Sequence, residues 1–212
     1  MRRIFFFFLI LFSFLISSCS TNTTPATPAL VSVYSTFAAE PWLPPLYDCA
    51  GTSVVISRVD DSSSADIVLR VGEPKVLTSS AYQIDSEDIL IVTHRQSPVQ
   101  NLSLEETRAL FAGQGDPFVQ VWVYSSEEDV QEAFDQFVMA GLSITSSARL
   151  AATPQQMSDT LVNESNAVGI LPRHWKAGDD REVFSVATVP VLAMTQSKPQ
   201  GVIKALIACL QK

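Results

Sequence analysis

The spacing of apolar and polar residues predicts short strands that alternate with helices. The run at residues 88–93 is dominated by Ile, Leu and Val and has the length of a strand buried on both faces. A polar loop follows, and then Ser103 can cap a helix while Glu106, three residues later, completes a capping box. Gly113 is a suitable C-terminal stop for that helix. This strand, loop and helix form the common building unit of an α/β protein.

The same pattern extends over the rest of the chain. Further strands are predicted at 30–35, 53–59, 65–71, 118–124, 166–171 and 183–194. Helix starts are predicted at Ser125, where Glu128 would complete a second capping box, at Thr153 followed by Pro154, and at Pro199. Strands and helices in alternation indicate an α/β fold.

The N-terminus has the pattern of an export signal. Arg2 and Arg3 precede an apolar run at residues 4–16, which is too short to cross a bilayer, because that takes about 20 apolar residues. The sequence Ile-Ser-Ser-Cys that ends at Cys19 resembles the bacterial lipobox, in which the cysteine is acylated and becomes the first residue of the mature protein. An ordinary signal peptide cleaved nearby is the alternative.

We therefore expect residues 1–18 to be a lipoprotein signal peptide and Cys19 to carry a lipid that anchors the protein to the cell membrane on its extracytoplasmic side. Residues 19–29 are rich in Thr and Pro and have no apolar periodicity, which is typical of an extended tether. The folded part then begins near Leu30 and is long enough for one domain or two small lobes.

Two cysteines remain after Cys19. Exported proteins meet oxidising conditions, and an even number of cysteines favours pairing. Cys49 ends the first helical segment and Cys209 lies in the last one, so we predict a disulfide that joins the two ends of the fold. Two buried free thiols are the alternative.

The charge and the motifs of the chain argue against nucleic-acid binding and against catalysis. The chain has 14 basic and 22 acidic residues, a net charge of −8, and no basic stripe, so nucleic acid is not an expected partner. The only histidines are His94 and His174, and the sequence has no Gly-rich phosphate loop, Cys-x-x-Cys pair or nucleophile elbow. These features favour binding over catalysis, with no cofactor and no metal.

Several segments occur in an order that resembles a known family. They are "IVTH", "SPVQNLSLEETRALFAG", "VQVWVY", "AVGILP" and "PVLA". Their order is similar to that of the phosphate-type substrate-binding proteins of ABC importers, in the type 2 periplasmic-binding-protein superfamily. The resemblance implies two α/β lobes, each a mixed sheet flanked by helices, joined by two hinge crossings. The first lobe would comprise residues 30–88 and 190–212 and the second residues 89–189, with a polar turn at 60–64 in place of a longer helix.

The resemblance also implies where a ligand would bind. It places Ser35 and Thr36 after the first strand, and Ser125 and Ser126 at a helix start, as ligand contacts. Arg70, at the end of the third predicted strand, would face the ligand, lie on the rim of the cleft or pair with an acid. The most serious departure of this chain from the family lies at that helix start. Where the phosphate binders have Ser-Gly-Thr-Arg, this chain continues after its two serines with three carboxylates, 127–129, which would repel an oxyanion and compete for the same amides.

The function that the resemblance implies is that of a monomeric, membrane-anchored solute-binding lipoprotein. It would capture a small oxyanion such as phosphate and deliver it to an ABC permease. The alternative is a binding-protein-like domain that serves as a surface interaction or sensory module without transport. An enzyme is not expected.

Overall fold

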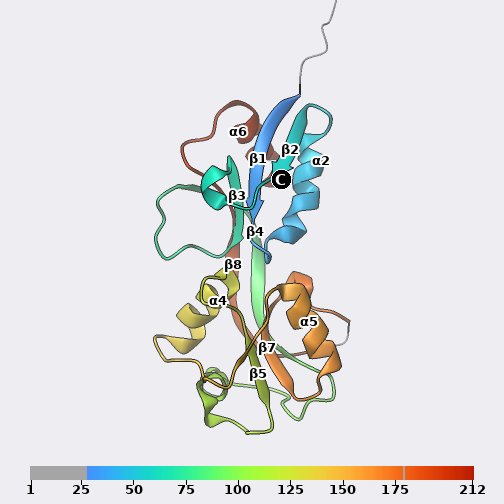
Figure 1. Ribbon diagram of the computed structural model, residues 1–212, viewed down its shortest axis with the longest axis vertical. Coiled ribbons are helices and arrows are strands. Elements are labelled where there is room, and N and C mark those ends of the chain that lie inside the picture. The colour runs from blue at the N-terminus through green and yellow to red at the C-terminus, as the bar shows by residue number, and fades with distance from the viewer. Residues whose placement is uncertain (1–27, 179) are drawn as a thin grey trace, which may run out of the picture.

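The computed structural model describes residues 28–178 and 180–212 (Figure 1). The predicted signal peptide, Cys19 and nearly all of the tether lie outside the described residues. The strands are β1 (Ala29–Ser35), β2 (Val54–Arg58), β3 (Ile67–Val71), β4 (Ser80–Thr93), β5 (Gln120–Val123), β6 (Arg149–Leu150), β7 (Ala167–Pro172) and β8 (Arg181–Thr195). The α-helices are α2 (Leu43–Ala50), α3 (Leu104–Ala109), α4 (Asp129–Phe134), α5 (Pro154–Asn163) and α6 (Gly201–Leu210). Within the described ranges, no helix is both long and apolar enough to cross a membrane.

Two long strands organise the molecule. β4 and β8 pair antiparallel along their whole length, from Ser80 opposite Thr195 to Thr93 opposite Arg181. β3 pairs with residues 191–194 of β8, near one end of this ribbon, and β7 pairs with residues 89–93 of β4, at the other end. The strand order is β2-β1-β3-β8-β4-β7-β5-β6. The ribbon therefore carries a group of strands at each end and links two lobes (Figure 1).

The first lobe contains β1, β2 and β3 with α2 and α6, and the second contains β5, β6 and β7 with α4 and α5 (Figure 1). In both lobes, helices flank strands that pair in both parallel and antiparallel directions. The predicted two-lobed α/β fold, with two chain crossings between the lobes, is therefore confirmed. The residue limits of the lobes, 30–88 with 190–212 and 89–189, remain a prediction. The apolar core includes Ile67 and Leu69 in the first lobe and Phe111, Phe134 and Ile170 in the second. A few polar and charged residues are buried as well, among them Glu87 and Asp129.

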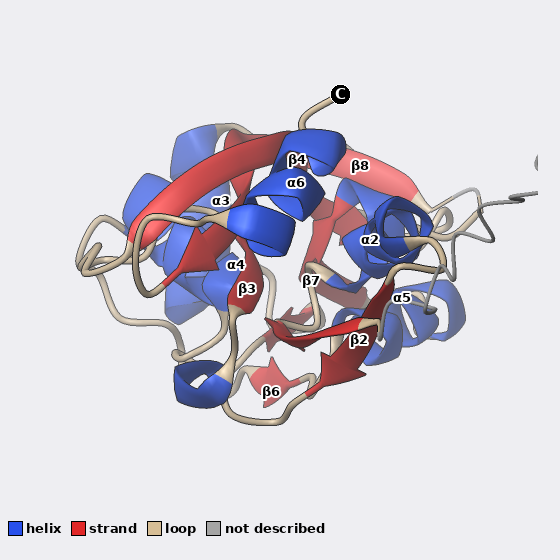
Figure 2. Cartoon of the chain, turned by 90° about the horizontal axis from the view of Figure 1, so that it is seen from above, coloured by secondary structure: helices blue, strands red, loops and turns tan. Residues whose placement is uncertain are grey.

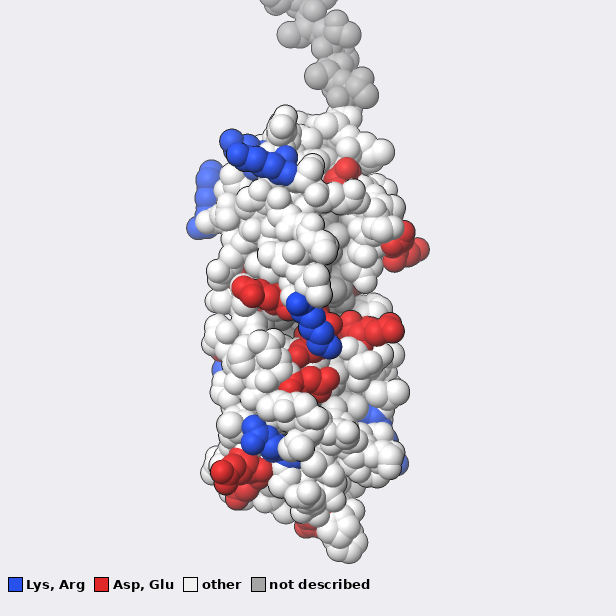
Figure 3. Space-filling model, turned by 90° about the vertical axis from the view of Figure 1, so that its left-hand side faces the viewer, with Lys and Arg blue, Asp and Glu red and all other residues white. Residues whose placement is uncertain are grey.

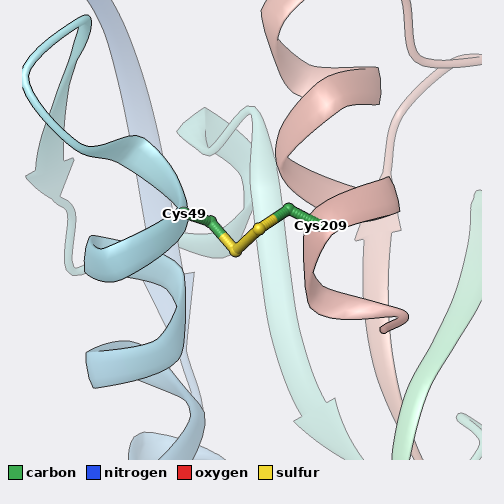
Figure 4. The surroundings of a disulfide bond; sticks show 2 residues. All are labelled: Cys49 and Cys209. Carbon is green, nitrogen blue, oxygen red and sulfur yellow. A yellow bond between two sulfur atoms is a disulfide. The ribbon is translucent and has the colours of Figure 1, made fainter.

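The predicted disulfide links two helices of the first lobe. Cys49 in α2 and Cys209 in α6 face each other from adjacent helices, with 6.0 Å between their Cα atoms (Figure 4). Figure 2, the view from above, shows α2 and α6 next to each other, and Figure 1 shows both beside β1, β2 and β3 at one end of the molecule. The bond joins residues 160 positions apart and so ties the beginning of the fold to its end.

The predicted helix starts were correct in two cases and wrong in two. Ser103 and Glu106 form the predicted capping box, and Thr153 caps α5 by accepting a hydrogen bond from the Gln156 amide at 3.1 Å. The second predicted box is wrong, because α4 begins at Asp129 and Glu128 is its N-cap without a side-chain bond. The backbone carbonyl of Ser125 instead accepts a bond from the Glu128 amide in a turn that precedes the helix. The predicted start of the last helix at Pro199 is also early, since α6 begins at Gly201.

Candidate functional site

Donor groups of the first lobe converge where the two lobes meet. β1 and β3 are parallel neighbours, with Ser35 opposite Leu69, so their C-terminal ends lie at the same edge of the sheet. Thr36 follows β1 directly, while Arg70 and Val71 end β3. The Thr36 hydroxyl, the Arg70 guanidinium and the Val71 amide all bond to acidic side chains of α4 in the second lobe. Strand order thus brings three hydrogen-bond donors to one point.

Asp129 is the central acceptor. One of its carboxylate oxygens, Oδ2, accepts from the Thr36 hydroxyl at 2.6 Å and from the Val71 amide at 2.8 Å. The other oxygen, Oδ1, accepts from the amide of Val130 in its own helix at 2.9 Å. Asp129 is only 3% exposed. Hydrogen bonds to a carboxylate are stronger than those between neutral groups, so this contact joins the lobes firmly.

A second acidic residue of α4 engages the arginine. Arg70 donates from its Nη2 atom to the Glu132 carboxylate at 2.9 Å and from its Nε atom to the Gly72 carbonyl at 3.1 Å. Lys75 Nζ lies 3.8 Å from the same carboxylate. Asp129 and Glu132 are three residues apart and so share one face of α4. We call Thr36, Arg70, Val71, Asp129 and Glu132 the interlobe cluster.

Burial and negative charge shift several pKa values around the cluster. Burial raises the pKa of Asp129, although its bonds to Thr36 and Val71 and the charge of Arg70 oppose this. Burial, and then the neighbouring Asp129 carboxylate, raise the pKa of Glu128. Burial also raises the pKa of Tyr124 well above its ordinary value, and Asp129 and Glu128 add to the effect. In Figure 3 acidic side chains gather across the middle of the face shown.

A small cavity adjoins the cluster. It has a volume of about 230 Å³ and is lined by Gly72 of the first lobe, by Asp129, Ala133 and Phe137 of the second, and by Pro190 of β8. One water takes about 30 Å³ of liquid volume, so the cavity has room for a small ion with several waters. Tyr124 is buried near these carboxylates, and its hydroxyl has no hydrogen-bond partner among the described residues.

The structure separates the five predicted ligand residues. Thr36 and Arg70 belong to the interlobe cluster, and Arg70 pairs with an acid, which was one of its three expected roles. Ser35 donates its hydroxyl to the Thr36 carbonyl at 2.9 Å. Ser125 and Ser126 are exposed in the turn before α4. Whether any of the five contacts a ligand remains a prediction.

Sequence reasoning missed the Val71 amide and the contact between Asp129 and the first lobe. A main-chain donor leaves no side-chain signal in a sequence. The acidic run at 127–129 did signal a conflict with an oxyanion, but it did not indicate that one of these carboxylates would bond to donors of the other lobe.

A second contact between the lobes involves His174. Its Nδ1 atom lies 2.6 Å from the carboxylate of Glu87 on β4, and its ring packs against that of Trp42 with centroids 4.7 Å apart. Trp42 also donates to Asp85 at 2.9 Å, and Trp175 donates to the Ala38 carbonyl at 3.3 Å. In the described part of the chain, no group of His, Cys, Asp and Glu side chains could hold a metal ion.

Glu87 makes the stability of this contact depend on pH. It is 2% exposed, and burial raises its pKa despite the opposing effect of His174. A raised pKa in the folded state means that the stability contribution is complete below the unfolded pKa of about 4.3 and is lost as the pH rises through the folded value. Glu87→Gln cannot ionise. We therefore expect the melting temperature of this variant, relative to the native protein, to increase from pH 4 to pH 7.5.

Thermal unfolding at a series of pH values measures this effect. Glu105→Gln, at an exposed position in α3, is the matched control and should run parallel to the native protein. A constant difference between Glu87→Gln and the native protein over this range would show that Glu87 does not titrate with folding.

Comparison with solved structures places this geometry in a known fold, whereas no family model and no curated protein matches the sequence. A candidate phosphate ABC transporter substrate-binding protein with bound phosphate from Clostridium perfringens superposes with a TM-score of 0.74 at 15% identity, over 85% of this chain and 92% of that one. An ABC-type phosphate transport receptor from Vibrio cholerae gives 0.64 at 14% identity, over 86% and 93%.

Regulatory domains share the same architecture. The CcmR regulatory domain from Synechocystis in complex with 2-PG superposes with a TM-score of 0.63 at 10% identity, over 86% of this chain and 96% of that one. Binding proteins and regulatory domains thus both match at identities that show the fold alone. The chain has the two-lobed fold of the type 2 periplasmic binding proteins, in divergent form.

Proposed function

We propose that this chain is a membrane-anchored, extracytoplasmic binding protein that takes a small oxyanion of the phosphate class between its lobes and passes it to an ABC permease. The observation that carries the proposal is the convergence of Thr36, Arg70 and Val71 on two neighbouring carboxylates of α4, with Thr36 and Val71 bonded to Asp129 and Arg70 bonded to Glu132. A hydroxyl, a main-chain amide and a guanidinium are the groups that bind an oxyanion. Two lobes joined by a two-stranded ribbon are also suited to opening and closing about a hinge.

The anchor is the second part of the proposal. The lipobox-like sequence that ends at Cys19 and the Thr/Pro-rich segment behind it support a lipid-anchored domain on a tether. We expect the native chain, expressed in a bacterial host, to incorporate an alkyne-tagged fatty acid and to fractionate with membranes. Cys19→Ser should lose both properties. Label retained by Cys19→Ser would contradict the anchor and leave the binding proposal untouched.

Calorimetric titration of the mature protein with phosphate, sulfate, molybdate and tungstate tests the ligand class. We expect at least one of these anions to bind saturably but weakly, because the donors are occupied by Asp129 in the closed form. Thr36→Val keeps the side-chain shape and removes the hydroxyl, but this hydroxyl also bonds to Asp129, so the substitution is tested in Asp129→Ala. There it should weaken binding by about tenfold, the effect of losing one hydrogen bond to a charged group. Equal affinity in Asp129→Ala with and without Thr36→Val would remove this site from the proposal.

One observation favours a second candidate. The donors that would bind a solute already hold a buried carboxylate of the same chain, as a domain without an external ligand would show. In that case the protein is a surface interaction or sensory module on a binding-protein scaffold. Absence of binding for all four anions to the native protein, even at millimolar concentration, would favour this module over transport.

A further inference from the structure

We infer that Asp129 is a built-in occupant of the oxyanion position, so that the protein closes on its own carboxylate without solute and an external oxyanion has to displace it. The ligand class rests on the proposed function. The self-closure rests on the contacts of the interlobe cluster alone.

The geometry of Asp129 fits the role of an internal ligand. Its Oδ2 atom accepts two hydrogen bonds from the first lobe, from Thr36 and Val71, as an oxygen of a bound oxyanion would. Its Oδ1 atom is held by the Val130 amide, which fixes the orientation of the carboxylate. Since Asp129 belongs to the second lobe and both donors belong to the first, the contact forms only when the lobes are together.

The Val71 amide bonds to a side chain, whereas the next amide along the chain bonds to the backbone of a neighbouring strand. The next amide, that of Gly72, donates to the carbonyl of Pro190 on β8 at 2.7 Å. Val71 is buried, and its amide would be left without a hydrogen-bond partner if no acceptor reached it, which is unfavourable for a buried donor. Asp129 supplies that acceptor in this structure. An external anion could supply it equally well once Asp129 has moved.

The charge of Arg70 is also balanced by a carboxylate of α4. Glu132 holds Arg70, and the two side chains are only 21% and 15% exposed. Two carboxylates of α4 therefore satisfy the two side-chain donors and the main-chain donor of the first lobe. A bound oxyanion would meet the same donors, but it would also lie beside Glu128, whose pKa is raised by burial and by Asp129. The acidic residues of α4 thus substitute for a solute and also oppose one.

Competition of this kind has a measurable consequence. A ligand that binds only the form without the internal contact has an apparent Kd equal to its intrinsic Kd divided by the population of that form. Asp129→Ala removes the competing carboxylate and leaves Thr36, Arg70 and Val71 in place. We expect this variant to bind phosphate or sulfate at least tenfold more tightly than the native protein.

The experiment compares the native protein with Asp129→Ala, Asp129→Asn and Glu127→Ala by calorimetric titration with phosphate and sulfate. Glu127→Ala removes one exposed charge from the turn next to Asp129 and should stay within about threefold of the native affinity. Asp129→Asn keeps the shape and one acceptor oxygen, so it should fall between the native protein and Asp129→Ala and also serves if the alanine variant does not fold. Adding Thr36→Val to Asp129→Ala should reverse the gain.

Small-angle scattering without solute gives an independent readout of closure. We expect the native protein to be compact and Asp129→Ala to show a larger radius of gyration.

Native affinity in Asp129→Ala, together with an unchanged radius, would overturn the inference and leave the proposed function standing. If no variant binds either anion but Asp129→Ala expands, self-closure is supported and the oxyanion ligand class is overturned. If Asp129→Ala binds an anion and the native protein binds neither, the inference is supported and the module without transport is favoured.

Discussion

Replacing both Cys49 and Cys209 by serine is expected to lower the free energy of unfolding by about 3–5 kcal/mol. The bond closes a loop of 160 residues, and the entropy that a cross-link removes from the unfolded chain grows with loop length. It also joins α2 to α6, the first and last α-helices of the described chain, within the first lobe. Equilibrium unfolding in guanidinium chloride measures the change.

Reductant supplies the control for the disulfide prediction. The native protein should lose a similar amount of stability when its disulfide is reduced, whereas the double-serine variant should not respond. A loss below about 1 kcal/mol in the double variant would mean that packing between α2 and α6 holds the ends of the fold without the bond.

Phe111→Ala is expected to cost about 3–5 kcal/mol, the usual range for removing a buried aromatic ring. Phe111 follows α3 in the second lobe, is fully buried and packs against Phe134 at 4.5 Å between ring centroids. Phe134 is itself fully buried in α4, so we expect the space left by the ring to stay largely unfilled. This substitution tests the core of the second lobe as the cysteine pair tests that of the first.

Phe118→Ala is the matched control for Phe111→Ala. Phe118 is 83% exposed and lies at the loop before β5, so its replacement should change stability by less than about 0.5 kcal/mol. Thermal and denaturant unfolding of both variants gives the comparison. Similar losses in both would show that Phe111 is not part of a packed core.

The sequence predicted the architecture well because its signals are local or periodic. The run at 88–93 is a buried strand, the Ser103 capping box forms within four residues, and the order of strands and helices is sufficient for an α/β fold. The disulfide could be predicted from compartment and cysteine number. What the pattern could not show is that β4 extends back to Ser80, so that it pairs with β8 across both lobes.

The site was predicted less well because long-range contacts decide it. Ser125 and Glu128 have the spacing of a capping box, but α4 begins at Asp129, whose carboxylate bonds to Thr36, 93 residues away. The sequence left the role of Arg70 open, because only the fold brings Glu132 beside it. The Val71 amide could not be found in a sequence, since every residue except proline has one.

The Asp129 carboxylate of the second lobe bonds to Thr36 and Val71 of the first, and we expect this contact to keep the lobes together without solute. Double electron–electron resonance between spin labels on cysteines introduced at Thr78 and Leu142, both exposed and in different lobes, measures the opening directly while the native cysteines remain paired. Without solute, we expect one short distance in the native background and a longer, broader distribution in Asp129→Ala. Saturating phosphate should restore the short distance in that variant. Identical distributions in both backgrounds would contradict the account.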